Sequence, residues 1–341
     1  MATNLERAEL EPQVTQVANP PIILDPMEQD LILRYLQARA HSLTRLRTQG
    51  YALTTATDPT PRLSKGSVPI HEFELAPPRS TKNTQRTRRA IVIDCEMVEV
   101  ANGCSELASL SAIDFLTGEV LINNYVHPTS KVVFWRTKHS GITPALMASA
   151  VAAGQALNGW PEARKRLWEF ATRDTVLIGH SLNHDLDVLG ILHSKVVDSS
   201  ILTGEAVFPA LLPTQRLTRT WGLKKLAQEL LAHKIQTGKA GHDALEDAYA
   251  TRNVVIWCIR NPELLKEWAE QARHQEAQHK AEKSQRKRRK ARSKGKAPAS
   301  KPVGSPQDLD SNSSSDPFDV AAYLVECGWP HPDTGYEPWS D

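Results

Sequence analysis

Cysteine, aromatic residues and long apolar runs are all scarce in this sequence of 341 residues. The four cysteines lie far apart and form no C-x-x-C pair, which argues against a disulfide scaffold and against a cysteine-rich zinc module. No stretch approaches the roughly 20 apolar residues that a membrane-spanning helix needs. The first ten residues carry charges in place of the apolar core of a secretory signal. We therefore expect a reduced intracellular protein without a membrane partner.

Net charge is also low, at +2, but it is unevenly distributed along the chain. Counting Lys and Arg against Asp and Glu, the balance is +3 over residues 1–89 and −1 over residues 90–262. It is then +7 over residues 263–300 and −7 over residues 301–341. We predict a neutral central domain, a basic and partly helical extension, and an acidic, mostly disordered tail.

The central part of the chain alternates β-branched runs with amphipathic segments, which predicts one α/β domain of about 170 residues with a mixed sheet. A buried strand is expected at Ala90–Ile93 and another at Thr175–Ile178. Between them, Leu107–Ile113 and Glu119–Val126 flank a short turn and predict a hairpin.

Helices are predicted where leucines recur at three- and four-residue spacing, along residues 182–189 and 223–230. Pro144 and Pro161 each stand where a helix would begin, since a proline at that position gives up no hydrogen bond. Before this domain, residues 1–87 are expected to hold a helix near 26–47 and a linker rich in Pro, Thr and Arg.

Two carboxylates follow the first predicted strand. Asp94 and Glu96 are two residues apart, so in an extended chain both point to the same face. Two like charges at that separation are costly unless a cation lies between them, and carboxylate oxygens suit Mg²⁺ or Mn²⁺. Taken alone, such a pair is more often a solvated strand end.

Two further acidic segments lie near predicted helix starts. Asp185 is one turn into a helix, where the helix dipole would stabilise a carboxylate whatever its function. Asp243 is a predicted N-cap with Glu246 as its capping-box partner, which leaves His242 and Asp247 without a structural explanation. A histidine there could act as a general base near neutral pH.

Taken together, these segments resemble the three motifs of the DEDDh 3′→5′ exonucleases. The motifs are Asp94-Cys95-Glu96-Met97, Gly179-His180-Ser181-Leu182-Asn183-His184-Asp185-Leu186 and His242-Asp243-Ala244-Leu245-Glu246-Asp247-Ala248. The first is similar to the eukaryotic RNA exonuclease branch. Supporting stretches follow in the order of that branch: His127-Pro128, Arg136-Thr137, Ser140-Gly141-Ile142-Thr143, Val197-Asp198 and Leu223-Lys224-Lys225-Leu226. Phe134 departs from the branch, which usually has an acid there.

The resemblance implies a ribonuclease H-like fold, with a mixed five-stranded sheet flanked by helices, over residues 88–262. It implies that two ions, Mg²⁺ or Mn²⁺, are held by four carboxylates, with Asp94 bridging both, and that His242 takes the proton from the attacking water. The metal ligands would be Asp94, Glu96, Asp185 and Asp247. Met97, through its backbone, and Arg136 are the candidates to contact the terminal ribose; a phosphate contact or a surface ion pair is the alternative for Arg136.

The implied partner is the 3′ end of single-stranded RNA, with single-stranded DNA as the alternative substrate. A third hypothesis is an inactive nuclease fold that tethers RNA, but all five catalytic positions are filled. The basic run Lys280–Lys296, centred on Lys287, Arg288, Arg289 and Lys290, predicts a nuclear import signal that an import receptor reads, an RNA-backbone contact, or both. We therefore expect a nuclear or nucleolar enzyme of ribosomal RNA processing, with the cytoplasm as the alternative location.

Overall fold

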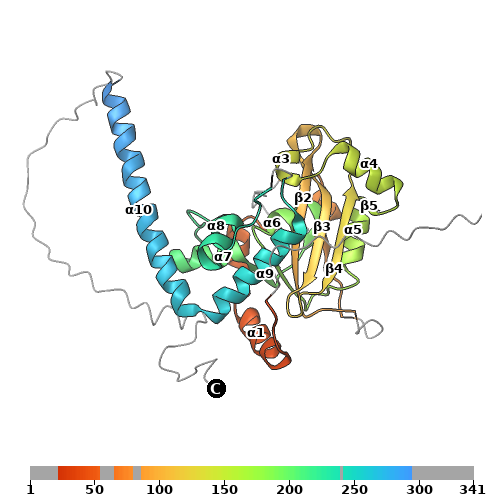
Figure 1. Ribbon diagram of the computed structural model, residues 1–341, viewed down its shortest axis with the longest axis horizontal. Coiled ribbons are helices and arrows are strands. Elements are labelled where there is room, and N and C mark those ends of the chain that lie inside the picture. The colour runs from red at the N-terminus through yellow and green to blue at the C-terminus, as the bar shows by residue number, and fades with distance from the viewer. Residues whose placement is uncertain (1–21, 54–64, 80–85, 239–240, 294–341) are drawn as a thin grey trace, which may run out of the picture.

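The computed structural model describes the chain except for residues 1–21, 54–64, 80–85, 239–240 and 294–341 (Figure 1). The side chains of residues 288–293 are also outside the description. A mixed sheet is the centre of the fold, and its strands lie in the order β5-β4-β3-β2-β6-β8. They span Ala156–Asn158 (β5), Val120–His127 (β4), Ser105–Asp114 (β3), Ala90–Glu99 (β2), Val176–Gly179 (β6) and Val196–Asp198 (β8).

The predicted α/β class and the helix-flanked mixed sheet are confirmed, with two differences of detail. Among the described residues this sheet has six strands in place of five, because the short edge strand β5 pairs in parallel with β4. Strand β2 does not end at Ile93 but continues to Glu99, so Asp94 and Glu96 lie inside it. Its antiparallel pairing with β3 holds the polar residues in the strand, across a bulge between Glu96 and Met97.

Helices cover both faces of the sheet. On one face, Ile91 and Ile93 of β2 pack into an apolar core with α5 (Gly159–Leu167) and α6 (Asn183–Leu189). On the other face, Ala90 and Val92 pack under α9 (Ala244–Arg260). The remaining helices of the sheet domain are α3 (Thr137–Ser140), α4 (Pro144–Ala152), α7 (Ser199–Val207) and α8 (Leu223–Leu230).

The described N-terminal segments pack against this domain. The helix expected near residues 26–47 is two helices, α1 (Pro26–Ala38) and α2 (Leu43–Thr48). Hydrogen bonds between His41 and β8 separate the two helices. The His41 backbone N–H donates to Val196 O at 2.9 Å, and the His41 ring accepts from Asp198 N at 3.0 Å. A second, two-stranded sheet joins β1 (Glu74–Leu75) to β7 (Ile191–Leu192).

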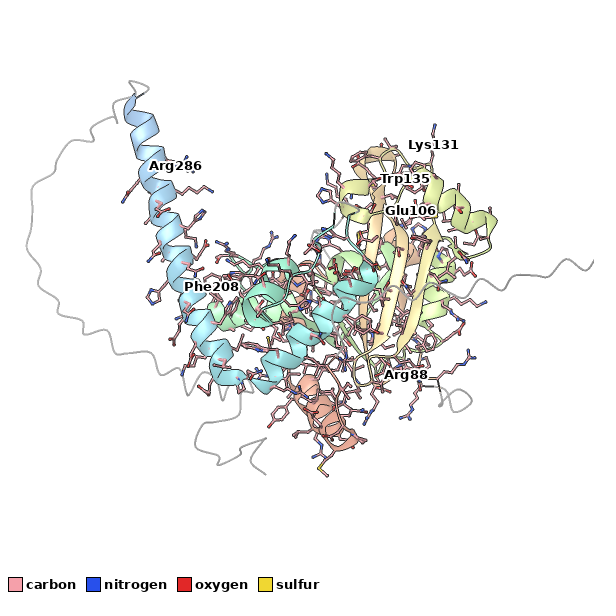
Figure 2. The ribbon with its side chains drawn as sticks, viewed as in Figure 1. Arg88, Glu106, Lys131, Trp135, Phe208 and Arg286 are labelled. Atoms are coloured by element: carbon pink, nitrogen blue, oxygen red, sulfur yellow. The ribbon has the colours of Figure 1, made fainter. Side chains whose placement is uncertain are left out.

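The last described element is α10 (Pro262–Ser293), which extends away from the sheet domain (Figure 1). Leu265, Ala269 and Ala272 anchor its first half against α7 and α8. Beyond Glu276 its described side chains are exposed, and Figure 2 shows Arg286 well away from the sheet. In the described part of the chain, no helix is both long and apolar enough to cross a membrane.

Candidate active site and metal centre

Strand β2 brings the first two acids onto the face that α9 covers. Side chains alternate along a strand, so Asp94 and Glu96 continue the row that begins with Ala90 and Val92. The row changes from apolar to acidic near the N-terminus of α9, the helix that carries Asp247 in its first turn. Glu96 is only 9 % exposed, so these carboxylates are not the solvated strand end that a pair of acids could represent.

The first turn of α6 brings in the third acid. Asp185 is buried, and its Oδ1 accepts a hydrogen bond of 2.8 Å from the backbone N–H of Cys95, the residue between Asp94 and Glu96. The loop before α6 is held by Asp198, whose carboxylate accepts from the backbone N–H groups of Ser181 and Leu182. The second motif is thereby fixed directly against the first.

The start of α9 supplies the remaining two predicted residues. Asp243 caps this helix as expected, accepting from the backbone N–H groups at 245 and 246. The predicted capping box is wrong, because Glu246 accepts from Gln236 N at 2.9 Å rather than turning back to Asp243. His242 lies in the preceding loop, and its Nδ1 is 3.6 Å from Oδ2 of Asp247.

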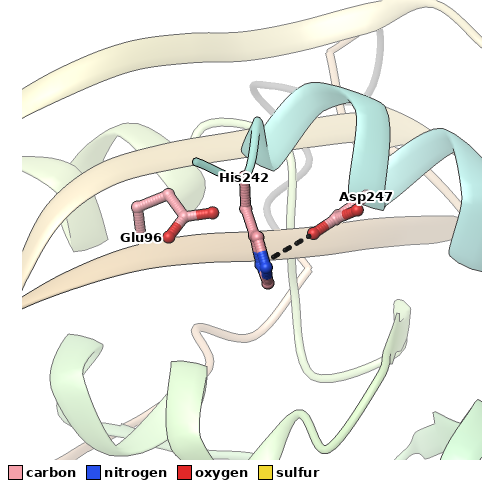
Figure 3. Close-up of side chains that lie close together, drawn as sticks. All are labelled: Glu96, His242 and Asp247. Atoms are coloured by element: carbon pink, nitrogen blue, oxygen red, sulfur yellow. Dashed lines mark ion pairs between the residues drawn. The ribbon is translucent and has the colours of Figure 1, made fainter. Parts of the chain in front are cut away.

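Figure 3 shows Glu96, His242 and Asp247 converging from β2 and the start of α9. One ligand atom of each lies within 4.8 Å of the other two, a spacing that could hold a metal ion. Asp94 and Asp185 belong to the same group, since, in addition to burial, the charges of Asp185, Asp247 and Glu96 raise the pKa of Asp94, and the charge of Asp185 also raises that of Glu96. The structure therefore brings together all five predicted catalytic residues.

The ionisation of these acids shows how poorly their charges are compensated. Burial, followed by the charges of Asp185, Asp247 and Glu96, raises the pKa of Asp94 well above its usual range. Burial is also the main reason that the pKa is raised to about 8 at Glu96, to about 8 at Asp185 and to about 7 at Asp247. Oxygen-rich groups that resist ionisation without a cation are suitable ligands for Mg²⁺ or Mn²⁺. The residues present fit a divalent metal centre.

His242 differs from the acids in the direction of its shift. Burial, together with nearby His139 and Lys224, lowers the pKa of its imidazole. Its ring packs edge-on against that of His139, and its backbone N–H donates to His139 O at 2.6 Å. The imidazole is therefore held next to the acids in the neutral form that a general base requires.

A cavity of about 540 Å³ opens beside Glu96 and His242. Its floor is the sheet, where Ser109 of β3 lies opposite Glu96 and Tyr125 of β4 lies opposite Ser109. The lining also includes Asn123, Gln155, the turn at Ser140–Ile142 and the acid Asp243, and it contains no Lys or Arg among the described residues. This cavity was not anticipated from the sequence, although residues at alternate positions of the hairpin carry its polar side chains.

The predicted ribose contacts lie outside the described lining of that cavity. Arg136 forms an ion pair with Glu99 at 3.0 Å and donates to Ser105 Oγ at 3.0 Å. The ion pair corresponds to the alternative considered for Arg136. The side chain of Met97 packs against the core on the opposite face of the sheet. A ribose contact by the Met97 backbone or by Arg136 stays a prediction.

Gln236 is a further residue that the sequence did not indicate. Its amide nitrogen donates to both carboxylate oxygens of Asp247, at 3.1 and 2.8 Å, and its φ is +54°. It lies between α8 and α9, where no periodicity or motif pointed to it. In the basic run, Lys287 is exposed on α10, whereas the side chains of Arg288, Arg289 and Lys290 lie outside the described residues.

Residues 91–255 match the family model described as Exonuclease (RNase_T). This stretch, just under half of the chain, is therefore similar to that exonuclease family. RNA exonuclease 3 of Candida albicans is 32 % identical over 181 residues, which is 53 % of this chain and 41 % of that protein. Exonuclease GOR of Pan troglodytes is 32 % identical over 187 residues, 54 % of this chain and 24 % of the relative. These matches confirm the resemblance to the eukaryotic RNA exonuclease branch.

This chain therefore spans less than half the length of these two relatives. Among solved structures, the PAN2 pseudoubiquitin-hydrolase–RNase module of Saccharomyces cerevisiae is similar, with a TM-score of 0.47 and 19 % identity. That similarity covers 68 % of this chain and 36 % of the module.

Proposed function

We propose that this protein is a metal-dependent 3′→5′ exoribonuclease that releases nucleoside 5′-monophosphates from RNA 3′ ends. The observation that carries the proposal is the convergence, inside an exonuclease domain, of four carboxylates, three of them buried, and one neutral histidine. RNA as the substrate is supported by the relative named RNA exonuclease 3.

Asp94, Glu96, Asp185 and Asp247 would hold two divalent ions, Mg²⁺ or Mn²⁺. When bound, such ions acidify a water and stabilise charge on the phosphate and the departing oxygen. His242 accepts the proton of the attacking water, and its contact with Asp247 stabilises the imidazolium that results. The water oxygen bonds to phosphorus, the bond from phosphorus to the 3′-oxygen breaks, and a shortened strand with a new 3′-hydroxyl leaves.

The cavity beside Glu96 and His242 would receive the terminal nucleoside. A base and a ribose present uncharged donors and acceptors, which match a lining of Ser109, Asn123, Gln155 and Tyr125. The Tyr125 ring would offer a surface on which a base of any identity can stack. By holding the terminal nucleoside, this polar cavity would orient the last phosphodiester towards the acids.

The test incubates purified protein with 5′-labelled single-stranded RNA, and separately with the matching DNA, in Mn²⁺, Mg²⁺ or EDTA. We expect a ladder that shortens from the 3′ end, runs faster on RNA and stops in EDTA. Faster shortening of DNA would instead establish a DNA exonuclease. Tight RNA binding with no shortening of either strand would overturn the proposal in favour of a tethering protein.

We further propose that the enzyme acts in the nucleus on ribosomal RNA precursors, with the basic run centred on Lys287 as the sequence that an import receptor reads. Replacing residues 287–290 with alanine in a fluorescent fusion tests the location. Loss of nuclear accumulation is expected. A fusion that stays cytoplasmic before the replacement would overturn the assignment.

A further inference from the structure

A second cavity, of about 640 Å³, adjoins α6, the helix that carries Asp185. We call it the Arg216 cavity. Asn183 and His184, the two residues before Asp185, form part of its wall. The rest of its described lining is Gln49, Ser181, Asp198, Ser200, Ile201, Arg216, Leu217, Thr218, Arg219 and Thr220. One wall of this cavity is therefore continuous with the metal centre.

The outer wall is a loop between α7 and α8 that is held rigidly from inside. Arg45 is 2 % exposed, and its guanidinium donates to Gln215 O at 2.6 Å and to Leu211 O at 3.1 Å. It also pairs with Glu205 at 2.6 Å. Leu217 is buried in the core on the other side of Arg216. Anchored residues on both sides thus fix the backbone that carries the exposed side chain of Arg216.

The chemistry of the Arg216 cavity differs from that of the cavity beside Glu96. Arg216 and Arg219 bring two permanent positive charges, and Thr218 and Thr220 add exposed threonine side chains. Arg219 stacks 5.4 Å from the Trp221 ring centroid and pairs with Glu276 of α10. Since Glu276 already compensates Arg219, the exposed guanidinium of Arg216, with the neighbouring hydroxyls, is the group that suits an oxyanion such as a phosphate.

Two further observations support an oxygen-rich ligand. Gln49 belongs to this lining, and its buried Nε2 atom has no hydrogen-bond partner among the described residues, so the side chain retains an unsatisfied donor. Asp198 is the acid in the lining, but its oxygens already accept from Tyr51 Oη, from Ser200 Oγ and from backbone N–H groups. Hydrogen-bond donors within the chain therefore compensate the negative charge of Asp198.

We propose that the Arg216 cavity binds backbone phosphates of the single-stranded RNA upstream of the bond being cleaved. This inference rests on the proposed function and deepens it. The proposed function places the terminal nucleoside in the cavity beside Glu96 and His242, on one side of the acids. The rest of the strand would then leave on the other side, across α6, where the Arg216 cavity lies. A substrate too short to reach Arg216 gains nothing from the cavity, whereas a longer strand does.

The test compares a dinucleotide RNA with a single strand of about 10 nucleotides, long enough to fill a typical single-strand site. The variants are Arg216→Glu, the milder Arg216→Gln, and Arg34→Ala as the control, since Arg34 is exposed on α1. We expect both Arg216 variants to lower kcat/KM on the longer strand, with Arg216→Gln lowering it about tenfold. Dinucleotide cleavage and the Arg34→Ala variant should be unchanged. The dependence of binding on log salt should become shallower by about 0.7 per lost phosphate contact.

Each alternative outcome has a distinct meaning. Equal kcat/KM for wild type and both Arg216 variants on the longer strand would overturn the inference and leave the proposed function intact. An equal loss on both substrates would also overturn it, since it would place Arg216 within the reaction itself or in folding. If the wild-type enzyme cleaves neither substrate, the proposed function has failed first. Thermal unfolding of each variant checks that the fold is retained.

Discussion

Two carboxylates in neighbouring parts of the sheet, one buried and one half-buried, behave in opposite ways. Asp198 ends β8, and Asp94 lies in β2, with β6 between them. Burial acts to raise the pKa of Asp198, but the charge of His180 and hydrogen bonds from Tyr51, Ser181 and Ser200 hold it below its usual value. At Asp94, burial and neighbouring acids both raise the pKa. Burial alone therefore does not distinguish a functional acid from a structural one.

The difference lies in what surrounds each oxygen. Donors supplied by the chain satisfy Asp198, so it can hold the loop before α6 without any ligand. At Asp94, burial and the charges of Asp185, Asp247 and Glu96 raise the pKa, and a bound cation would compensate these acids. The comparison predicts that substitution will affect folding at one site and activity at the other.

The largest expected effect is the loss of activity in Asp94→Asn. Removing one of four mutually repelling acids weakens metal binding, and we expect kcat to fall about 10³-fold or more, because electrostatic stabilisation of the transition state is typically worth that much. The melting temperature of the metal-free protein should stay equal or rise, since a repulsion is relieved. Asp247→Asn should behave alike. Activity retained in cleanly purified Asp94→Asn would contradict the assignment of the metal ligands.

Asp198→Asn is expected to show the opposite pattern. The asparagine amide would place an N–H donor where the surrounding chain offers only donors. Buried groups would lose their hydrogen-bond partners, which lowers the free energy of unfolding by about 3 kcal/mol. For a domain of this size, that corresponds to a melting temperature lower by about 10 °C. Calorimetry measures the change. A normal melting temperature would show that Asp198 is not the structural acid described above.

Much of this fold follows from local sequence patterns. The β-branched run at Ala90–Ile93 and the leucine stripe of α8 are local signals, and each lies in the element predicted for it. The extension of β2 to Glu99 could not be predicted, because pairing with β3 decides it. The break between α1 and α2 likewise depends on hydrogen bonds from His41 to the distant β8.

The residues of the site likewise divide into those that the sequence predicts and those that depend on the fold. The five catalytic positions could be found because their residue types and order form a recognisable set. Gln236 beside Asp247 and the polar floor at Ser109 and Tyr125 could not, since they depend on loop conformation and strand register. The partner of Arg136 was also undetermined, as an ion pair to Glu99 requires the fold to be known.

The pH dependence of the metal-free protein sharpens the comparison further. Glu96, Asp185 and Asp247 have native pKa values of about 7 to 8, above the unfolded values near 4. The native state therefore binds more protons between these limits, and the free energy of unfolding should fall as pH rises from about 5 to 8. Each unit of difference is worth about 1.4 kcal/mol, although coupling among the acids makes their sum smaller than three independent shifts. Urea unfolding in EDTA measures the trend.

Adding Mn²⁺ should reverse that trend, because the metal binds the ionised acids and releases their protons. Calorimetric titration in two buffers of different ionisation enthalpy would count the protons released, which should decrease as pH rises. Stability in EDTA that stays constant over this range, with no proton release on metal addition, would mean that the acids are already ionised and compensated by the chain.

The smallest expected effect concerns Gln236. Its side-chain amide donates to Asp247, so this predicted metal ligand also accepts from a donor of the chain, as Asp198 does. Partners that orient a metal ligand are typically worth 10- to 100-fold in metal affinity, so Gln236→Ala should raise the Mn²⁺ concentration for half-maximal activity about tenfold. The maximal rate at saturating Mn²⁺ should change little, because the ligands themselves remain. Gln215→Ala, in an exposed loop residue, is the matched control. Tighter Mn²⁺ activation in Gln236→Ala would instead mean that the amide competes with the metal for Asp247 and has to be displaced before the ion binds.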